Sequence, residues 1–477
     1  MDNRTRWLAL YVLCLATLMI VLDVTIVGVA LPSIRNSLGF SETSLAWVVN
    51  AYLLTYGGFL LLGGRFGDLF GQRRLFIGGI ALFTTASLVC GLSNSQGMLV
   101  GARAVQGLGG AVASAVSLSL MVNLFTEQAD RAKAMGIFGF VASGGGSIGV
   151  LLGGVLTDAL SWHWIFLVNI PIGVVVVLLS LRLLPETNAH AASGRLDIAG
   201  ALAVTASLMI AVYAIVNGNQ NGWGSTETIG LLLAAAALLA AFLRIESRVS
   251  APLMPLRMFR IRNVATADIV AVLWSASMFA WFFLSALYLQ LVLGYSPLQV
   301  GLAFLPANLI MAAFSVSLSA RLVMRFGLKR PMAGGLLFAA AGLALFMRAP
   351  VGGSFLVDVL PSMVLLGVGA GTAFNPLLLA AMADVAPEES GLASGMVNTA
   401  SMMGGALGLA VLATAAASRT SSLAASGAGH LSALVGGYHL AFLLGAISAA
   451  LGAAIGYGFL RVGAPVHVED AEPLEAY

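Results

Sequence analysis

The sequence contains very little charge. Charged residues make up 9% of its 477 residues, whereas a soluble globular domain carries about 25%. Hydrophobic residues make up 59% and the mean hydropathy is +0.97. The apolar residues come in runs of about 20, the length that a helix needs to cross a hydrocarbon layer of roughly 30 Å. This composition excludes a water-soluble domain and indicates an all-α membrane protein with many spans.

Residues that hold disulfides, metals and cofactors are scarce as well. The two cysteines, Cys14 and Cys90, lie inside apolar runs, where cysteine is a small packing residue rather than half of a structural disulfide. The five histidines are scattered, and we find neither a Gly-Lys-Ser/Thr phosphate loop nor a nucleophile elbow between a strand and a helix. We therefore expect no metal site, no cofactor and no catalytic residue, which argues against an enzyme.

The small excess of positive charge does not indicate nucleic-acid binding. The formal net charge is +3, and the basic residues are spread over short loops instead of forming a patch on a polar domain. We expect no nucleic-acid partner.

Apolar runs separated by polar breaks predict fourteen transmembrane helices. The first run has no small-residue cleavage site, so we interpret it as a retained span rather than a signal peptide. The predicted spans are 7–31, 43–63, 75–94, 97–122, 134–158, 164–184, 197–217, 227–245, 263–292, 298–320, 331–349, 356–382, 392–416 and 438–460.

Lysine and arginine sort onto one side of this topology. With a cytoplasmic N-terminus, all 23 basic residues lie in cytoplasmic loops except Arg35, Arg348 and Arg419, which become external, and Arg103, which lies within a span. The positive-inside rule requires such a bias. We expect both termini to be cytoplasmic and the protein to lie in the plasma or inner membrane.

A short segment occurs twice. Residues 65–74, after the second predicted span, align with 321–330, after the tenth. Parallel repeats predict copies after the second helix of each half, and the spacing of eight spans implies two inserted spans. The predicted domains are an N-terminal six-helix bundle at 1–184, two linker helices with cytoplasmic loops at 185–262, and a C-terminal six-helix bundle with a short tail at 263–477.

The first copy predicts a cytoplasmic gating loop. Gly64 and Gly71 permit a tight turn, and Arg73 and Arg74 hold it on the cytoplasmic side. Asp68 is suited to accept hydrogen bonds from a helix N-terminus or an arginine. We interpret this segment as a latch that breaks and reforms as the halves move. The alternative is an ordinary basic loop.

Glycines recur along the fifth predicted span. Gly145, Gly149 and Gly153 are spaced i, i+4, i+8, and Gly154 follows. This spacing places small residues on one helix face and lets another backbone approach closely. We expect the face to contact a helix of the other half.

Asp23 is the most informative residue. It lies nine residues before Pro32, about 13 Å from the outer end of the first span. A carboxylate at that depth is costly, faces the bundle interior or a water-filled cavity, and is a functional candidate. The alternative is an acid that only joins two helices by hydrogen bonds.

Two other charged residues lie within spans. Arg103 lies roughly 9 Å deep in the fourth span, at a depth similar to that of Asp23, so we expect it either to couple to that carboxylate or to serve as a structural hydrogen-bond hub. Asp268 lies only about 8 Å inside the ninth span. It is a possible secondary acid within reach of cytoplasmic water.

Aromatic and methionine side chains of the ninth span are candidates for the lining of an apolar substrate cavity, although such residues more often pack against other helices or face lipid. They are Trp274, Met278, Trp281, Phe282 and Phe283.

Several motifs in order resemble the 14-span drug:proton antiporter branch of the major facilitator superfamily. The resemblance extends over nearly the whole chain. The segments that carry it are 22–32, 64–74, 103–107, 145–154, 162–171 and 294–301.

The resemblance implies two six-helix bundles around a cavity that opens alternately to either side, and proton-coupled export of small amphipathic compounds such as drugs or antibiotics. Its implied partners are a small amphipathic substrate, protons and membrane lipids, and we expect a monomer. The direction comes from the resemblance alone, so a proton-coupled importer or facilitator on the same fold is the alternative. The chain departs from the antiporter pattern at Val150, where the family has proline.

Overall fold

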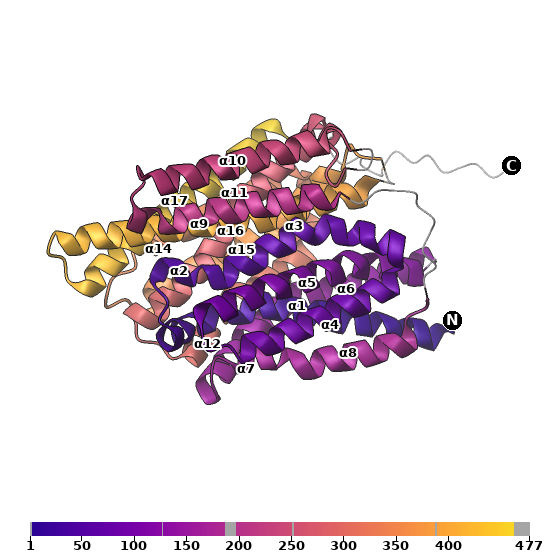
Figure 1. Cartoon of the computed structure of the whole chain (residues 1–477), viewed down its shortest axis with the longest axis horizontal. Coiled ribbons are helices and arrows are strands. Elements are labelled where there is room, and N and C mark those ends of the chain that lie inside the picture. Colours follow the sequence, from indigo (N-terminus) through magenta and orange to yellow (C-terminus); the bar gives the residue numbers. More distant parts are fainter. Residues whose placement is uncertain (1, 126, 187–196, 250–251, 387–388, 462–477) are drawn as a thin grey trace.

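The computed structural model describes residues 2–125, 127–186, 197–249, 252–386 and 389–461, and it leaves out a few side chains within them, that of Asp68 included. The described chain is helical throughout and contains no strand. Its long helices run roughly along one common axis, so that each passes from one end of the molecule to the other (Figure 1).

The described residues of the first half of the chain form eight helices. They are α1 (Asn3–Leu38), α2 (Glu42–Leu45), α3 (Trp47–Phe70), α4 (Gln72–Gly91), α5 (Gln96–Leu124), α6 (Gln128–Ala159), α7 (Trp164–Leu167) and α8 (Asn169–Leu183).

Two long helices and a second group follow. They are α9 (Ile198–Asn221), α10 (Thr226–Glu246), the 3₁₀ turn η1 (Leu256–Arg260), α11 (Arg262–Leu287), the π-turn η2 (Tyr288–Val292), α12 (Pro297–Ala313), the π-turn η3 (Phe314–Leu318), α13 (Ser319–Phe326), α14 (Lys329–Phe346), the π-turn η4 (Phe355–Val359), α15 (Leu360–Met382), α16 (Ser390–Ala425) and α17 (His430–Phe459).

Twelve helices of the described chain are long and apolar enough to cross a membrane. They cover every predicted span except 298–320 and 331–349. The first of these two corresponds to α12, which is only 17 residues long but continues through η3 into α13. The second corresponds to α14, which begins with Lys329 and Arg330. The protein is therefore a multi-pass membrane protein of at least twelve apolar helices.

The sequence repeat is also a structural repeat. Gly71 ends α3 with φ +90°, and Gly327 ends α13 with φ +74°. Each donates its backbone N–H to the carbonyl four residues earlier, at Gly67 and Val323. Only a left-handed glycine allows the next helix to begin at once without strain. The predicted loop between the spans 43–63 and 75–94 is therefore too long, because 64–70 continue α3, 72–74 begin α4 and the turn is confined to Gly71.

Close helix contacts are repeated as well. A Cβ added to Gly79 of α4 would lie 2.8 Å from the backbone nitrogen of Ala113 on α5. A Cβ on Gly335 of α14 would lie 2.9 Å from the corresponding nitrogen of Ala373 on α15. Gly79 and Gly335 are separated by the same number of residues as Gly71 and Gly327, so two halves share one helix arrangement.

Within each half, glycines bring a pair of long helices together, α1 with α6 and α11 with α16. Between the halves, α3 packs on α16 and α6 packs on α12. The helices α9 and α10 pair with each other, and α9 lies against both α3 and α16. These two helices therefore lie on the outer side of the interface between the halves (Figure 1).

We call the end of the bundle where α1 begins, near the N label of Figure 1, the basic end, because the following arginine contacts lie there. Arg6 lies 3.9 Å from Asp130 at the start of α6. Arg65 donates a 3.0 Å hydrogen bond to the carbonyl of Pro252, before η1. Arg73 donates one of 2.5 Å to the carbonyl of Leu181 near the end of α8.

Candidate functional site

Asp23 and Arg103 form an ion pair inside the first half. Nη1 of Arg103 lies 2.5 Å from Oδ2 of Asp23, and their side chains are 1% and 0% exposed. The similar depths predicted from the sequence are confirmed as direct contact between α1 and α5. Asp23 faces the bundle interior, as the cost of a carboxylate in hydrocarbon requires.

Two amides complete the coordination of the carboxylate. Gln106 donates from Nε2 to Oδ1 of Asp23 at 2.8 Å, and Asn169 donates from Nδ2 to the same oxygen at 3.0 Å. Arg103 also donates to Oε1 of Gln106 at 2.7 Å. Charged and amide donors thus satisfy both oxygens of the buried carboxylate, the condition under which such a group is tolerated in a core.

Ser87 of α4 closes the network. Its hydroxyl accepts hydrogen bonds of 3.0 Å from both Gln106 and Asn169 and donates to the carbonyl of Phe166 at 2.9 Å. The network thus joins α1, α4, α5 and the start of α8. Oδ1 of Asn169 has no hydrogen-bond partner within the described part of the chain, although the residue is 1% exposed.

Arg103 is fixed by further contacts. Its Nε donates to the carbonyl of Val48 at 2.9 Å. Its guanidinium carbon lies 4.4 Å from the ring centroid of Tyr52 and 5.7 Å from that of Phe166, within the range of cation–π attraction. Arg103 is therefore a hydrogen-bond hub and a counter-ion of Asp23 at the same time.

Three members of this network were not singled out from the sequence. Gln106 and Asn169 lie inside the quoted segments 103–107 and 162–171, and Gln106 is one helical turn from Arg103. An amide at that spacing in an apolar span is a usable signal. Ser87 carried no such signal, since a lone serine in an apolar helix is common.

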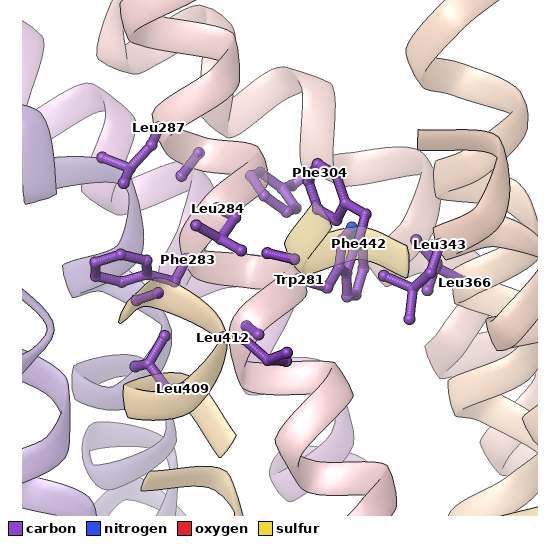
Figure 2. Packing of buried hydrophobic residues seen from close by; sticks show 14 of the residues in the cluster. Trp281, Phe283, Leu284, Leu287, Phe304, Leu343, Leu366, Leu409, Leu412 and Phe442 are labelled. Carbon is purple, nitrogen blue, oxygen red and sulfur yellow. The ribbon is translucent and has the colours of Figure 1, made fainter. Parts of the chain in front are cut away.

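An apolar cavity of about 210 Å³ lies between α1, α3 and α11. The candidates Met278, Phe282 and Phe283 line it, whereas Trp274 and Trp281 do not. Figure 2 shows Phe283 on the side of α11 opposite to Trp281, which packs against Phe304 inside the second half. The complete lining is Val24, Thr25, Gly28, Leu31, Val49, Met278, Phe279, Phe282 and Phe283.

A second cavity of about 350 Å³ lies toward the basic end, between α3, α5 and α16. It is more polar, with Arg65, Ser114, Ser119 and Asn398 in its wall. Both cavities therefore lie where the two halves face each other, one apolar and one polar.

The glycine face of α6 packs closely, but not against the other half. A Cβ on Gly145 would meet Val21, one on Gly149 would lie 2.1 Å from Oγ1 of Thr25, and one on Gly153 would lie 2.7 Å from the carbonyl oxygen of Ile26. All three partners belong to α1, so the predicted contact with the other half is wrong for these glycines.

Gly154, the next residue, does contact the other half. A Cβ on Gly154 would lie 2.7 Å from the carbonyl oxygen of Pro297 on α12, and one on Gly301 of α12 would lie 3.0 Å from that of Val150. Gly153 and Gly154 face different helices because consecutive residues of a helix point about 100° apart.

The residues of the predicted gating loop lie on two helices joined by the turn at Gly71. Gly64 belongs to α3, and Arg73 and Arg74 belong to α4. Arg73 makes the bond to Leu181 and an ion pair of 3.4 Å with Glu186. Arg74 is exposed, and Gly64 lines the polar cavity. The side chain of Asp68 lies outside the described residues.

Asp268 is more buried than its depth suggested. It is 7% exposed, and its Oδ1 has no hydrogen-bond partner among the residues described. It lies one helical turn before Val272, which packs on Gly404 of α16. The expectation that this carboxyl reaches water is wrong for the conformation described here.

Comparisons with known proteins agree with this architecture. A family model described as Major Facilitator Superfamily matches residues 13–409. A puromycin resistance protein of Streptomyces alboniger is 41% identical over 87% of this chain and 83% of its own length. A cephamycin export protein of Amycolatopsis lactamdurans is 38% identical over 90% and 88%.

A solved structure has the same fold. The bacterial homolog of the human lysosomal transporter Spinster superposes with a TM-score of 0.68 at 16% identity, over 96% of this chain and 97% of that one. Since the family model covers most of the chain, this protein is a member of the major facilitator superfamily.

Proposed function

We propose that this protein exports small amphipathic compounds of the antibiotic type across the membrane in exchange for protons, by alternating access. The observation that carries the proposal is the buried ion pair of Asp23 with Arg103, because Asp23 lies on α1, the helix that also lines the apolar cavity between the halves. The similarity to proteins named for puromycin resistance and cephamycin export supports a drug-like substrate.

Asp23 is the coupling acid in this proposal. In the conformation described, donors surround both carboxylate oxygens. A proton on Oδ1 needs an acceptor, and the unpaired Oδ1 of Asn169 supplies one if that amide rotates by half a turn. Protonation would then loosen the bond to Arg103 and free α1 to move relative to α5, which links proton binding to rearrangement of the cavity.

The membrane arrangement is part of the proposal. We propose fourteen spans, with α12–α13 and α14 added to the twelve long apolar helices, and with the basic end in the cytoplasm. Both termini are then cytoplasmic, and the units are 1–184, 185–262 and 263–477.

Gly71, Gly64 and Arg73 act in the cytoplasmic gate between α3 and α4, with Arg74 and Asp68 beside them. Asp268 is the reserve acid, and the transporter works as a monomer.

Proteoliposomes test this function. The purified protein is reconstituted, an acid interior is imposed, and uptake of radiolabelled puromycin is followed. Vesicles that hold the transporter with its basic end outward should accumulate puromycin above the external concentration, and nigericin should abolish the accumulation. Uptake that requires an alkaline interior identifies an importer. Uptake that only reaches equality identifies a facilitator.

A further inference from the structure

We propose that the apolar cavity binds an uncharged aromatic ring of the substrate, and that Gly405 on α16 sets the width of this cavity through Phe279. This inference rests on the proposed function for the statement that the bound molecule is a transport substrate. The binding of an uncharged ring is argued from the residues that line the cavity, and the role of Gly405 is argued from its close contact with Phe279.

The lining offers no partner for charge. None of its residues is ionisable, and its one side-chain hydroxyl, that of Thr25, already donates to the carbonyls of Val21 and Leu22 at 3.1 and 3.2 Å. Asp23 precedes Val24 of the lining but is paired with Arg103 on the other side of α1. A cationic group placed here would lose its hydration without a counter-ion, which strongly disfavours it.

Aromatic rings form the wall on α11. Phe282 is stacked on Phe304, with ring centroids 5.4 Å apart and an interplanar angle of 18°, and Phe304 is held in turn by Trp281 (Figure 2). This support fixes Phe282 in place. A fixed ring favours a flat aromatic ligand, because offset stacking and edge contacts add to the burial of apolar area.

Phe279 is held differently. A Cβ on Gly405 would lie 2.4 Å from Cδ2 and 2.9 Å from Cε2 of Phe279, so the ring lies directly against the backbone of α16. A methyl group at this position must displace the ring. Since the backbone of α16 closes one side of Phe279 and the cavity lies on another, the displaced ring enters the cavity and narrows it.

Gly28 provides an independent way to narrow the same space. It lines the cavity from α1, and a Cβ there would meet nothing within 4 Å. Gly28→Ala therefore adds a methyl group to the cavity without disturbing packing. Gly334→Ala on α14 is the matched control, because a Cβ at Gly334 also meets open space and Gly334 is not part of the lining.

Equilibrium binding tests the ligand class without any proton gradient. The protein in lipid nanodiscs is titrated with the uncharged dye N-phenyl-1-naphthylamine and with the permanent cation ethidium, with empty nanodiscs subtracted. We expect saturable binding of the neutral dye, weakened roughly fivefold by Phe282→Ala, the range of one lost aromatic contact. Tighter ethidium binding that is equally sensitive to Phe282→Ala would overturn the inference.

The role of Gly405 is tested in the same assay. Gly405→Ala and Gly28→Ala should each weaken binding of the neutral dye, whereas Gly334→Ala should not. Phe279→Ala combined with Gly405→Ala should restore most of the affinity, because the displaced ring is gone and the two changes are coupled. Additive losses would show that Gly405 does not act through Phe279. If the dye binds as expected but puromycin is not transported, the proposed function fails and the binding site stands.

Discussion

Asp23 and Thr25 lie two positions apart on α1 and face different environments. The carboxylate of Asp23 points into the network shared with α4, α5 and α8, whereas Thr25 lines the cavity and packs against Gly149 of α6. A substrate in the apolar cavity is thus next to α1 but does not touch the carboxylate. In the proposed mechanism, coupling between substrate and proton therefore passes through movement of α1, not through direct displacement.

We expect Asp23→Asn to abolish uphill export. The amide is nearly isosteric with the carboxylate, but it does not ionise and so neither takes up nor releases a proton. It also leaves Arg103 as a buried unpaired charge, which costs about 3–5 kcal/mol of stability. In proteoliposomes, adding puromycin should release protons from the wild type and none from the variant.

Asp268→Asn is the matched control for this experiment. It alters a buried carboxyl on α11 and should leave proton release intact. If Asp23→Asn still drives uphill export with an unchanged dependence on pH, the coupling acid lies elsewhere, and Asp268 is the next residue to test.

Asn169→Ala should change the pH dependence of transport without abolishing it. The substitution removes one donor to Asp23 and one to Ser87, at a cost of roughly 1–3 kcal/mol of stability. Because the carboxylate loses a neighbour that donates to it in this conformation and would accept its proton after rotation, the pH of half-maximal puromycin export should shift. Asn169→Ser, which retains a hydroxyl, should move it less. A purely structural role would lower expression and leave the pH profile of the surviving protein unchanged.

The sequence predicted the membrane class, the repeat and the similar depths of Asp23 and Arg103 because each depends on local patterns. Span depth follows from the helical rise, and the turn glycine recurs at Gly71 and Gly327 because both halves need the same left-handed residue. These features require no knowledge of how the helices are arranged around one another.

The partners of each helix face could not be predicted in the same way. Gly145, Gly149 and Gly153 identified a close-packing surface, but only the arrangement of helices shows that α1 covers it. The same holds for Ser87 and Asn169, which become part of one network because α8 packs against both α1 and α4. Burial of Asp268 likewise depends on neighbouring helices and not on its depth in α11.

The proposed topology predicts which cysteines an impermeant thiol reagent reaches. In a background of Cys14→Ala and Cys90→Ser, Ser426→Cys lies in the exposed turn after α16, at the end opposite to the basic end. It should be labelled in intact cells. Ser247→Cys, exposed after α10, should be labelled only after lysis. The reverse pattern would show that the basic end faces outward.

Gly149→Leu should block transport while leaving the protein in the membrane. A Cβ at this position already lies 2.1 Å from Oγ1 of Thr25 and 3.1 Å from the carbonyl oxygen of Leu22, so a leucine must push α1 away from α6. Overpacking of this kind costs about 1–3 kcal/mol, and it also moves Thr25, which walls the cavity.

The control is Gly136→Leu on the same helix, where a Cβ would meet nothing within 4 Å and the residue is exposed. Both variants add the same apolar side chain to α6, so a difference between them reports the α1–α6 contact and not the change in hydrophobicity. Puromycin export per molecule of protein in the membrane is the measurement. Equal export by the two variants would show that close approach of α1 and α6 is not needed for transport.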